Sequence, residues 1–173
     1  MSREAGPIVA NGDGTFSLHL DQSTRTTLDG FFDQLASLAG ERPDDDRLRR
    51  LHPDAYHLDP DKDSEWKDFM RPELAASRAA SIAVARRILA DPGPVSEADL
   101  HAFMRVMNSL RLVLGTLLEI EDDEEDGGYD TESLDDGDDH DDHDDHAAAQ
   151  WALYEFSGWL LEWTVRALSG ETD

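Results

Sequence analysis

Three histidines near the C-terminal third of the chain have spacing that suits metal binding. His140, His143 and His146 are three residues apart and alternate with pairs of aspartates. Neutral imidazoles and carboxylates are ligands for Zn²⁺, Ni²⁺ and Co²⁺. The same composition is typical of a solvated low-complexity linker. Because a stable zinc site needs supporting hydrogen bonds around its ligands, we favour the linker and keep a metal-binding loop as the alternative.

An acidic run just upstream invites comparison with a calcium-binding loop. Asp122, Glu124, Asp126 and Gly127 follow the start of such a pattern. The loop requires an acidic residue at its twelfth position, where this chain has Ser133. We therefore expect no specific calcium site.

A second group of polar residues interrupts an apolar stretch. Asn108, Arg111 and Gly115 are spaced by three and four residues, which places them on one face of a helix. Asparagine is unfavourable inside helices and often has a side-chain partner there. One interpretation is a partner contact or a buried polar cluster. The other, which we favour, is an arginine paired with an acid of the bundle and a glycine that allows close helix approach.

The remaining candidates do not assemble into a recognisable active site. His19, His52, His57 and His101 are scattered, and the glycines of 12–14 lack the lysine and helix start of a phosphate loop. The chain has no cysteine, which excludes disulfides, thiolate metal sites and cysteine redox switches. Its tryptophans fit the spacing of a helical core: Trp66, Trp151, Trp159 and Trp163. We therefore expect a protein that is not an enzyme and has no cofactor.

The charge distribution narrows the class of partner. The 173 residues contain 40 acids and 15 Lys and Arg, a formal net charge of −25, and residues 119–146 hold 17 of the acids and no Lys or Arg. This argues against direct binding to nucleic acid or to an anionic membrane, since both need clustered cations. No apolar run approaches the ~20 residues of a membrane span, and no segment resembles a signal peptide. We expect a cytoplasmic protein.

The elements that must position these residues are mostly helical. We expect one domain over 1–173 that is mainly α, a bundle of about four main helices with a small N-terminal β hairpin. The acidic segment 121–146 is expected to be a disordered loop before the last helix. The predicted elements are a hairpin over 8–20, a helix from Ser23 or Thr24 to about Ala39, a helical turn at 44–50, and helices at 62–70, 72–90, 97–118 and 147–168. The last is apolar on more than one side, which predicts a central helix covered by its neighbours.

Three segments together resemble a known family. They are residues 53–66, beginning Pro-Asp-Ala-Tyr; residues 108–116, with an Asn-x-x-Arg-x-x-x-Gly pattern; and residues 154–168, with Gly158-Trp159-Leu160. The chain resembles the actinobacterial family of the oxidative-stress transcriptional regulator AosR, formerly described as a domain of unknown function. Ser109, Leu117 and Glu119 depart from the family pattern and remove polar groups from the signature helix.

The resemblance implies a cytoplasmic transcription regulator that acts in the oxidative stress response. It implies contact with a protein partner, such as a sigma factor or RNA polymerase. The residues Asn108, Arg111, Gly115 and Trp159 serve either that contact or the structure as its signature. Sensing by paired cysteines cannot carry over, because the chain has none. The tryptophans of the last helix could also serve a homodimer. A metal-binding or metal-buffering module using His140, His143 and His146 is the alternative function.

Overall fold

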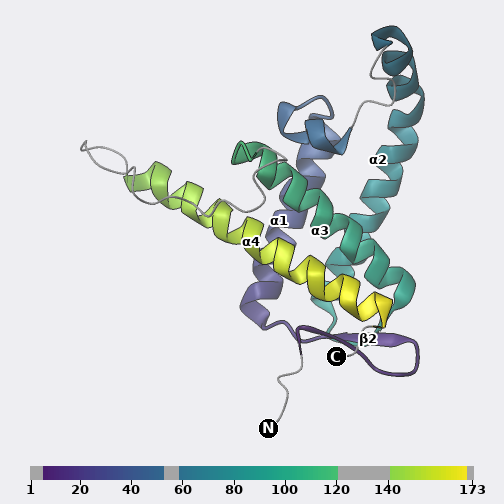
Figure 1. The fold of residues 1–173 in the computed structure, drawn as a ribbon, viewed down its shortest axis with the longest axis vertical. Helices are drawn as coiled ribbons and strands as arrows, with labels where there is room; N and C mark the ends of the chain where they lie inside the picture. Colours follow the sequence, from purple (N-terminus) through teal and green to yellow (C-terminus); the bar gives the residue numbers. More distant parts are fainter. Residues whose placement is uncertain (1–5, 53–58, 121–140, 171–173) are drawn as a thin grey trace.

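The computed structural model is mainly α, with four long helices and a small sheet (Figure 1). It describes residues 6–52, 59–120 and 141–170, and for 141–145 the backbone alone. The elements follow in the order β1 (Ile8–Ala10), β2 (Thr15–Leu18), α1 (Gln22–Glu41), the 3₁₀ helix η1 (Asp46–Leu51), α2 (Pro60–Ala90), β3 (Val95–Ser96), α3 (Glu97–Leu117) and α4 (Asp141–Ser169). The expected mainly α bundle with an N-terminal hairpin is confirmed.

The hairpin forms as its sequence predicts and gains a third strand. Gly12 and Gly14 have φ of 80° and 85°, the region that favours glycine, and they turn β1 into β2. Phe16 pairs with Val95 in the antiparallel β2–β3 ladder. Two residues of β3 are too few to produce a periodic signal, so sequence patterning did not reveal this strand.

Helix α1 begins at a different cap from the one predicted. Asp21, and not Ser23 or Thr24, is the N-cap, and its carboxylate accepts a 3.0 Å hydrogen bond from the Thr24 amide. The Thr24 hydroxyl donates to the same carboxylate at 2.7 Å. Aspartate is as good a cap as serine, so the candidates were close in propensity. Leu28, Phe32 and Leu35 form the buried face of the helix.

Helix α2 is one continuous helix, whereas two helices at 62–70 and 72–90 were predicted. Pro72 lies inside it and is not the start of a second helix. Proline lacks the amide that would bond the carbonyl of Asp68. Pro72 is exposed, so that carbonyl faces the solvent side of the helix, where water can satisfy it. The helix core contacts come mainly from its C-terminal half, where Ile82, Ala85, Ile88 and Leu89 are buried.

Helix α3, and not the last helix, is the central element. It packs against α1, α2, α4, η1 and the sheet, and lies between α2 and α4 in Figure 1. Ser96 is its N-cap and accepts from the Asp99 amide at 3.2 Å, as its sequence predicts. Phe103 is fully buried and meets Phe32 of α1 edge to face at 6.1 Å between centroids. Met107 is fully buried, and Met104 is half-buried.

The prediction of α4 as a covered central helix is wrong. Its buried stripe consists of Leu153, Ser157, Leu160 and Thr164. The hydroxyls of Ser157 and Thr164 donate to carbonyls of their own helix at 2.7 Å, so these polar side chains are buried with their hydrogen bonds made. Two leucines, a serine and a threonine form the contact face, and Trp159 is left 44% exposed.

Among the described residues, no helix has the length and apolarity required to cross a membrane. Helix α4 begins at Asp141, six residues before the predicted start at 147. Residues 121–140 of the predicted acidic loop lie outside the described residues.

Candidate functional site

The structure places Arg111 in the contact between α3 and α4. Its guanidinium carbon lies 4.6 Å from the centroid of the Tyr154 ring, a cation–π geometry. Gly158 faces the same side chain, because a Cβ at Gly158 would lie 3.3 Å from the Arg111 Nε. A larger residue at 158 would press against the arginine. Arg111 and Gly158, which lie far apart in the sequence, therefore pack against each other where α3 and α4 meet.

Gly115 makes room for a second arginine, which comes from η1. A Cβ at Gly115 would lie 2.9 Å from Nη1 of Arg50 and 3.5 Å from the Tyr154 ring. Arg50 in turn donates to the carbonyl of Ile120, beyond the end of α3. Gly115 therefore allows η1, α3 and α4 to meet at one point, as the close-approach interpretation expected.

The expected ion pair of Arg111 does not form within the part of the chain that is described. Its Nε is buried and has no hydrogen-bond acceptor there. The guanidinium is held by the Tyr154 ring, not by an acid of the bundle. Arg111 and Gly115 thus contribute to helix packing, and the surface they offer to a partner is limited.

Asn108 and Trp159, the other two predicted site residues, are both exposed. Asn108 lies one turn before Arg111 on α3, and its side chain makes no hydrogen bond to any described residue. Trp159 lies next to Gly158 on α4, with its ring 5.6 Å from that of Phe156 at an angle of 37°. The predicted signature is therefore split into a packed pair and an exposed pair.

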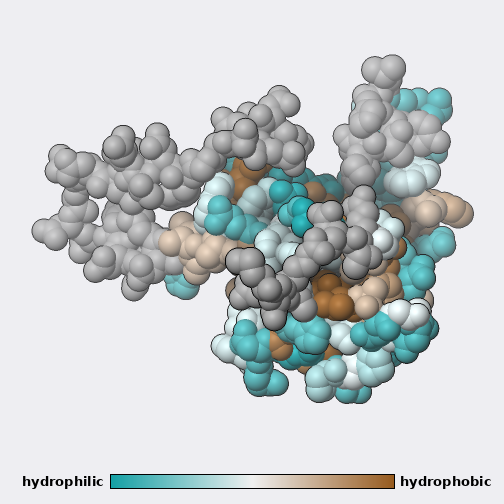
Figure 2. All heavy atoms as spheres, turned by 60° about the horizontal axis from the view of Figure 1, so that its bottom comes forward, coloured by the Kyte–Doolittle hydropathy of each residue, from teal (hydrophilic) through white to brown (hydrophobic). Residues whose placement is uncertain are grey.

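The solvent side of α4 forms a mixed aromatic and charged surface. We define the outer face of α4 as Glu155, Phe156, Trp159, Glu162, Trp163 and Arg166, which share one side of the helix. Arg166 bonds Glu162 at 2.6 Å and lies 5.5 Å from the Trp163 ring. Figure 2 views the sheet end of the molecule and shows apolar surface broken up by hydrophilic residues. The outer face combines a large exposed aromatic ring with a rim of charge.

The histidine cluster is only partly within the described residues. His146 is exposed on α4, His143 belongs to the first turn of the same helix, and His140 lies outside the described residues. The residues whose side chains are described contain no group of three or more His, Asp or Glu arranged to hold a metal ion. The helical backbone from Asp141 onward puts His143 and His146 three residues apart on one helix.

One residue that sequence reasoning left among the scattered histidines has a built environment. His52 follows η1 and lines a cavity between η1 and α2 with Arg71, Lys67 and Trp66. The pKa of His52 is lowered, first by burial and then by the nearby charges of Arg78, Arg71 and Lys67. No sequence signal pointed to this grouping, because its members come from two elements, the end of η1 and the first three turns of α2.

Comparison with known proteins identifies the family of the chain. No curated protein and no solved structure matches it. A family model, described as a domain of unknown function (DUF2017), matches residues 5–168. The match covers both helices of the Arg111 contact, the hairpin and the His52 cavity, and on this basis the chain belongs to the DUF2017 family.

Proposed function

We propose that this protein is a non-enzymatic regulator that binds a basic protein surface of the transcription machinery, on a sigma factor or RNA polymerase. The observation that carries the proposal is Trp159, which is 44% exposed on the outer face of α4 between Glu155 and Glu162. Tryptophan is the residue type most enriched among the few that dominate binding energy at protein interfaces. The resemblance to the AosR family supports the same assignment.

Charge supports the choice of a basic partner. The chain carries a net charge of −25, and two glutamates flank Trp159 on the outer face. Complementary charge speeds association and selects among partners. Surfaces of sigma factors and polymerase that face DNA are basic, so an acidic protein can compete for them.

The test is a binding titration of purified actinobacterial RNA polymerase, and separately of a free sigma factor, with the fluorescently labelled protein. Trp159→Ala should weaken binding about thirtyfold, which corresponds to the loss of about 2 kcal/mol at an interface hot spot. Raising the salt concentration should weaken binding of the wild type.

Val165→Ala is the matched control. Val165 is 51% exposed on the same helix but lies outside the outer face, so its truncation should leave the affinity within about twofold. Equal affinities of wild type and Trp159→Ala, or no binding to either target, would refute the proposal. Sedimentation velocity on the same variants tests whether Trp159 instead joins two copies of this chain.

The alternative function is a metal-binding module. The helical placement of His143 and His146 three residues apart favours it, because an i, i+3 pair can face one metal ion. Calorimetric titration with Zn²⁺ tests this alternative on the wild type and on a variant with His140, His143 and His146 replaced by alanine. A metal module should lose binding in the variant, whereas a regulator should keep its protein partner.

A further inference from the structure

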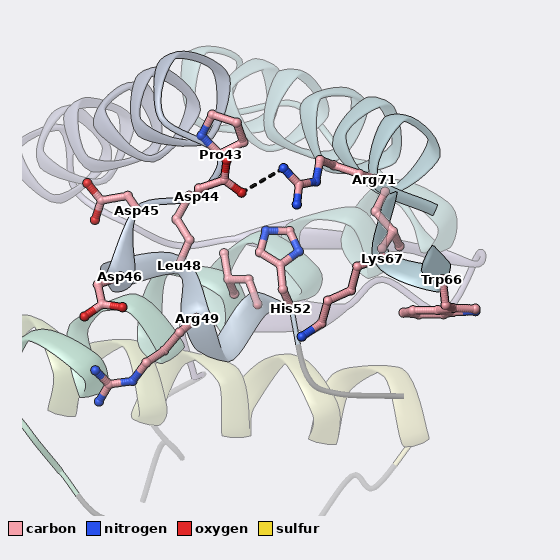
Figure 3. Close-up of a pocket in the computed structure, with 12 residues that line it drawn as sticks. Pro43, Asp44, Asp45, Asp46, Leu48, Arg49, His52, Trp66, Lys67 and Arg71 are labelled. Carbon is pink, nitrogen blue, oxygen red and sulfur yellow. Dashed lines mark hydrogen bonds and ion pairs between the residues drawn. The ribbon is translucent and has the colours of Figure 1, made fainter. Parts of the chain in front are cut away.

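A cavity of about 630 Å³ lies between η1 and the N-terminal half of α2 (Figure 3). Its volume falls within the range of about 300–1,000 Å³ that small-molecule sites occupy. Apolar side chains form part of its wall: Leu48, Leu51, Trp66 and Leu74. The cavity therefore offers a hydrocarbon surface large enough for the body of a small ligand.

The polar part of the wall consists of His52, three aspartates and three basic side chains: Asp44, Asp45, Asp46, Arg49, Lys67 and Arg71. Lys67 and Arg71 line the cavity on the α2 side, and Figure 3 shows Arg71 reaching over His52 toward Asp44. The charges of Arg78, Arg71 and Lys67 act on the imidazole in one direction, and that of Asp44 acts in the other. Three of the four charges that act on the imidazole are therefore positive.

The acids near the cavity are paired with basic side chains or point away from His52. Both carboxylate oxygens of Asp45 accept hydrogen bonds from the Arg47 guanidinium at 2.8 Å. Asp45 and Asp46 point away from His52 in Figure 3. Asp63 pairs with Lys67 at 2.8 Å, and Arg71 pairs with Asp44 at 2.7 Å and with Asp68 at 3.7 Å. These pairs offset the charges of Lys67 and Arg71, and the charge of Arg78 remains.

Arg78 gives a second, independent indication that the region around the cavity has too few negative charges. It is half-buried, and its only hydrogen bond to a described residue is a 3.4 Å contact to the Leu51 carbonyl. It makes no ion pair with any acid in the described parts of the chain. Burial lowers the pKa of Arg78, which reflects the cost of removing a cation from water. An anion in the neighbouring cavity would offset that cost.

We propose that this cavity binds a small ligand through an oxyanion, a phosphate or carboxylate group, contacted by His52, Lys67 and Arg71. Arginine presents a fork of donors that fits either group, and lysine and imidazole add further donors. Leu48, Leu74 and Trp66 contact the apolar part of the ligand. The site lies on η1 and α2 and is separate from the outer face of α4, so its test is independent of the proposed function.

The experiment follows the imidazole resonances of the full-length protein by NMR during titration with inorganic phosphate, phenyl phosphate and benzoate. Ionic strength is held constant with NaCl, and His52→Gln identifies the His52 signals. We expect a saturable shift of His52, while the exposed His19 remains unchanged. The pKa of His52 should rise in the complex, because a bound anion opposes the three cations. Comparing the affinities of phenyl phosphate and benzoate shows whether the site prefers a phosphate or a carboxylate group. Comparing the affinities of phenyl phosphate and inorganic phosphate shows how much the apolar wall contributes to binding.

Two variants assign the binding to these side chains. Arg71→Gln and Lys67→Gln should each weaken the tightest of the three anions about tenfold, the usual effect of losing one charge-assisted hydrogen bond. Arg87→Gln is the control, since Arg87 lies on the same helix, outside the cavity, in an ion pair with Asp99 at 3.0 Å. The affinity of Arg87→Gln for that anion should match the affinity of the wild type. The proposal is overturned if no anion produces a saturable shift, or if both cavity variants bind as well as Arg87→Gln.

Discussion

Arg25 shows how much a single side chain contributes to this fold. It is 6% exposed and donates to the carbonyls of Leu18 and Leu20, at 2.8 and 3.1 Å, beside the hairpin. It also donates to Ile88 and Leu89 at 3.0 and 3.2 Å, in the last turn of α2. The last carbonyls of a helix have no partner within the helix and attract positive charge. Arg25 therefore joins the sheet, α1 and the end of α2.

Replacing Arg25 with methionine should lower the free energy of unfolding by about 3 kcal/mol, because it leaves buried carbonyls without donors. Arg25→Lys should lie between this variant and the wild type, since lysine keeps the charge but lacks the planar fork. Urea unfolding followed by circular dichroism measures both.

Arg166→Met is the control for Arg25. Arg166 is exposed, and its ion pair with Glu162 should contribute less than about 1 kcal/mol. If Arg25→Met unfolds at the same urea concentration as Arg166→Met, the carbonyl bonds of Arg25 do not stabilise the fold.

At the scale of elements, the parts of α2 before and after Pro72 differ in how much of them is buried. The buried apolar residues of the helix lie after the proline, while the preceding turns bury only Asp63. Proline in a helix interior costs about 3 kcal/mol relative to alanine. Pro72→Ala should therefore slow amide hydrogen exchange in residues 61–71, with little change where the core already holds the helix.

Pro94→Ala is the matched control for Pro72. Pro94 is exposed and lies between α2 and β3, outside any helix. This variant should leave exchange in 61–71 unchanged. Equal exchange rates in Pro72→Ala and wild type would show that the first half of α2 does not open locally at the proline.

The sequence predicted the elements well where periodicity was strong and failed where packing decided. The face of α3 from Leu100 to Leu114 is buried as its spacing indicated. The orientation of α4 was missed, because Ser157 and Thr164 are polar by type and become buried only through bonds within their own helix. A hydropathy scale assigns one value to each residue type. It cannot show which side of a helix packs against a neighbour when both sides carry apolar side chains.

For the candidate site too, features within one helix could be predicted, whereas contacts between elements could not. The spacing of Arg111 and Gly115 placed them on one face, and the close approach at Gly115 was anticipated. The partners of these residues, Arg50, Tyr154 and Gly158, come from other elements and could not be paired from one sequence. The grouping around His52 is tertiary for the same reason.

At the scale of the whole molecule, three helical segments begin with an aspartate carboxylate, which makes the stability of the fold depend on pH. Asp21, Asp45 and Asp59 are the N-caps of α1, η1 and α2, and their carboxylates accept hydrogen bonds from backbone amides. Hydrogen bonds hold the pKa of each carboxyl below its ordinary value of 3.8. The largest cause is the bond from the Thr24 amide for Asp21, and the bonds from the Arg47 and Lys62 side chains for Asp45 and Asp59, with the backbone amides second. A depressed folded-state pKa means that the stabilisation is present above the unfolded value and is lost as the pH falls through the folded one.

Acid also reduces the net charge of −25, which relieves repulsion and acts in the opposite direction. Ordinary carboxylates take up protons at about pH 4, before the caps do. We therefore expect a thermal midpoint that holds or rises between pH 7 and about 4.5. It should begin to fall below about pH 3.8, and the fall should continue until the caps are protonated at their lower folded-state pKa.

Substituting Asp21 and Asp59 together with asparagine should flatten the acid fall, because asparagine caps helices without titrating. Asp46→Asn and Asp61→Asn, combined in one variant, make the same change of charge at exposed positions that are not caps, and this variant should fall with the wild type. Thermal unfolding from pH 7 to pH 3 measures all three proteins. Parallel falls in all three would mean that the acid sensitivity comes from the overall charge of the chain and not from the starts of its helices.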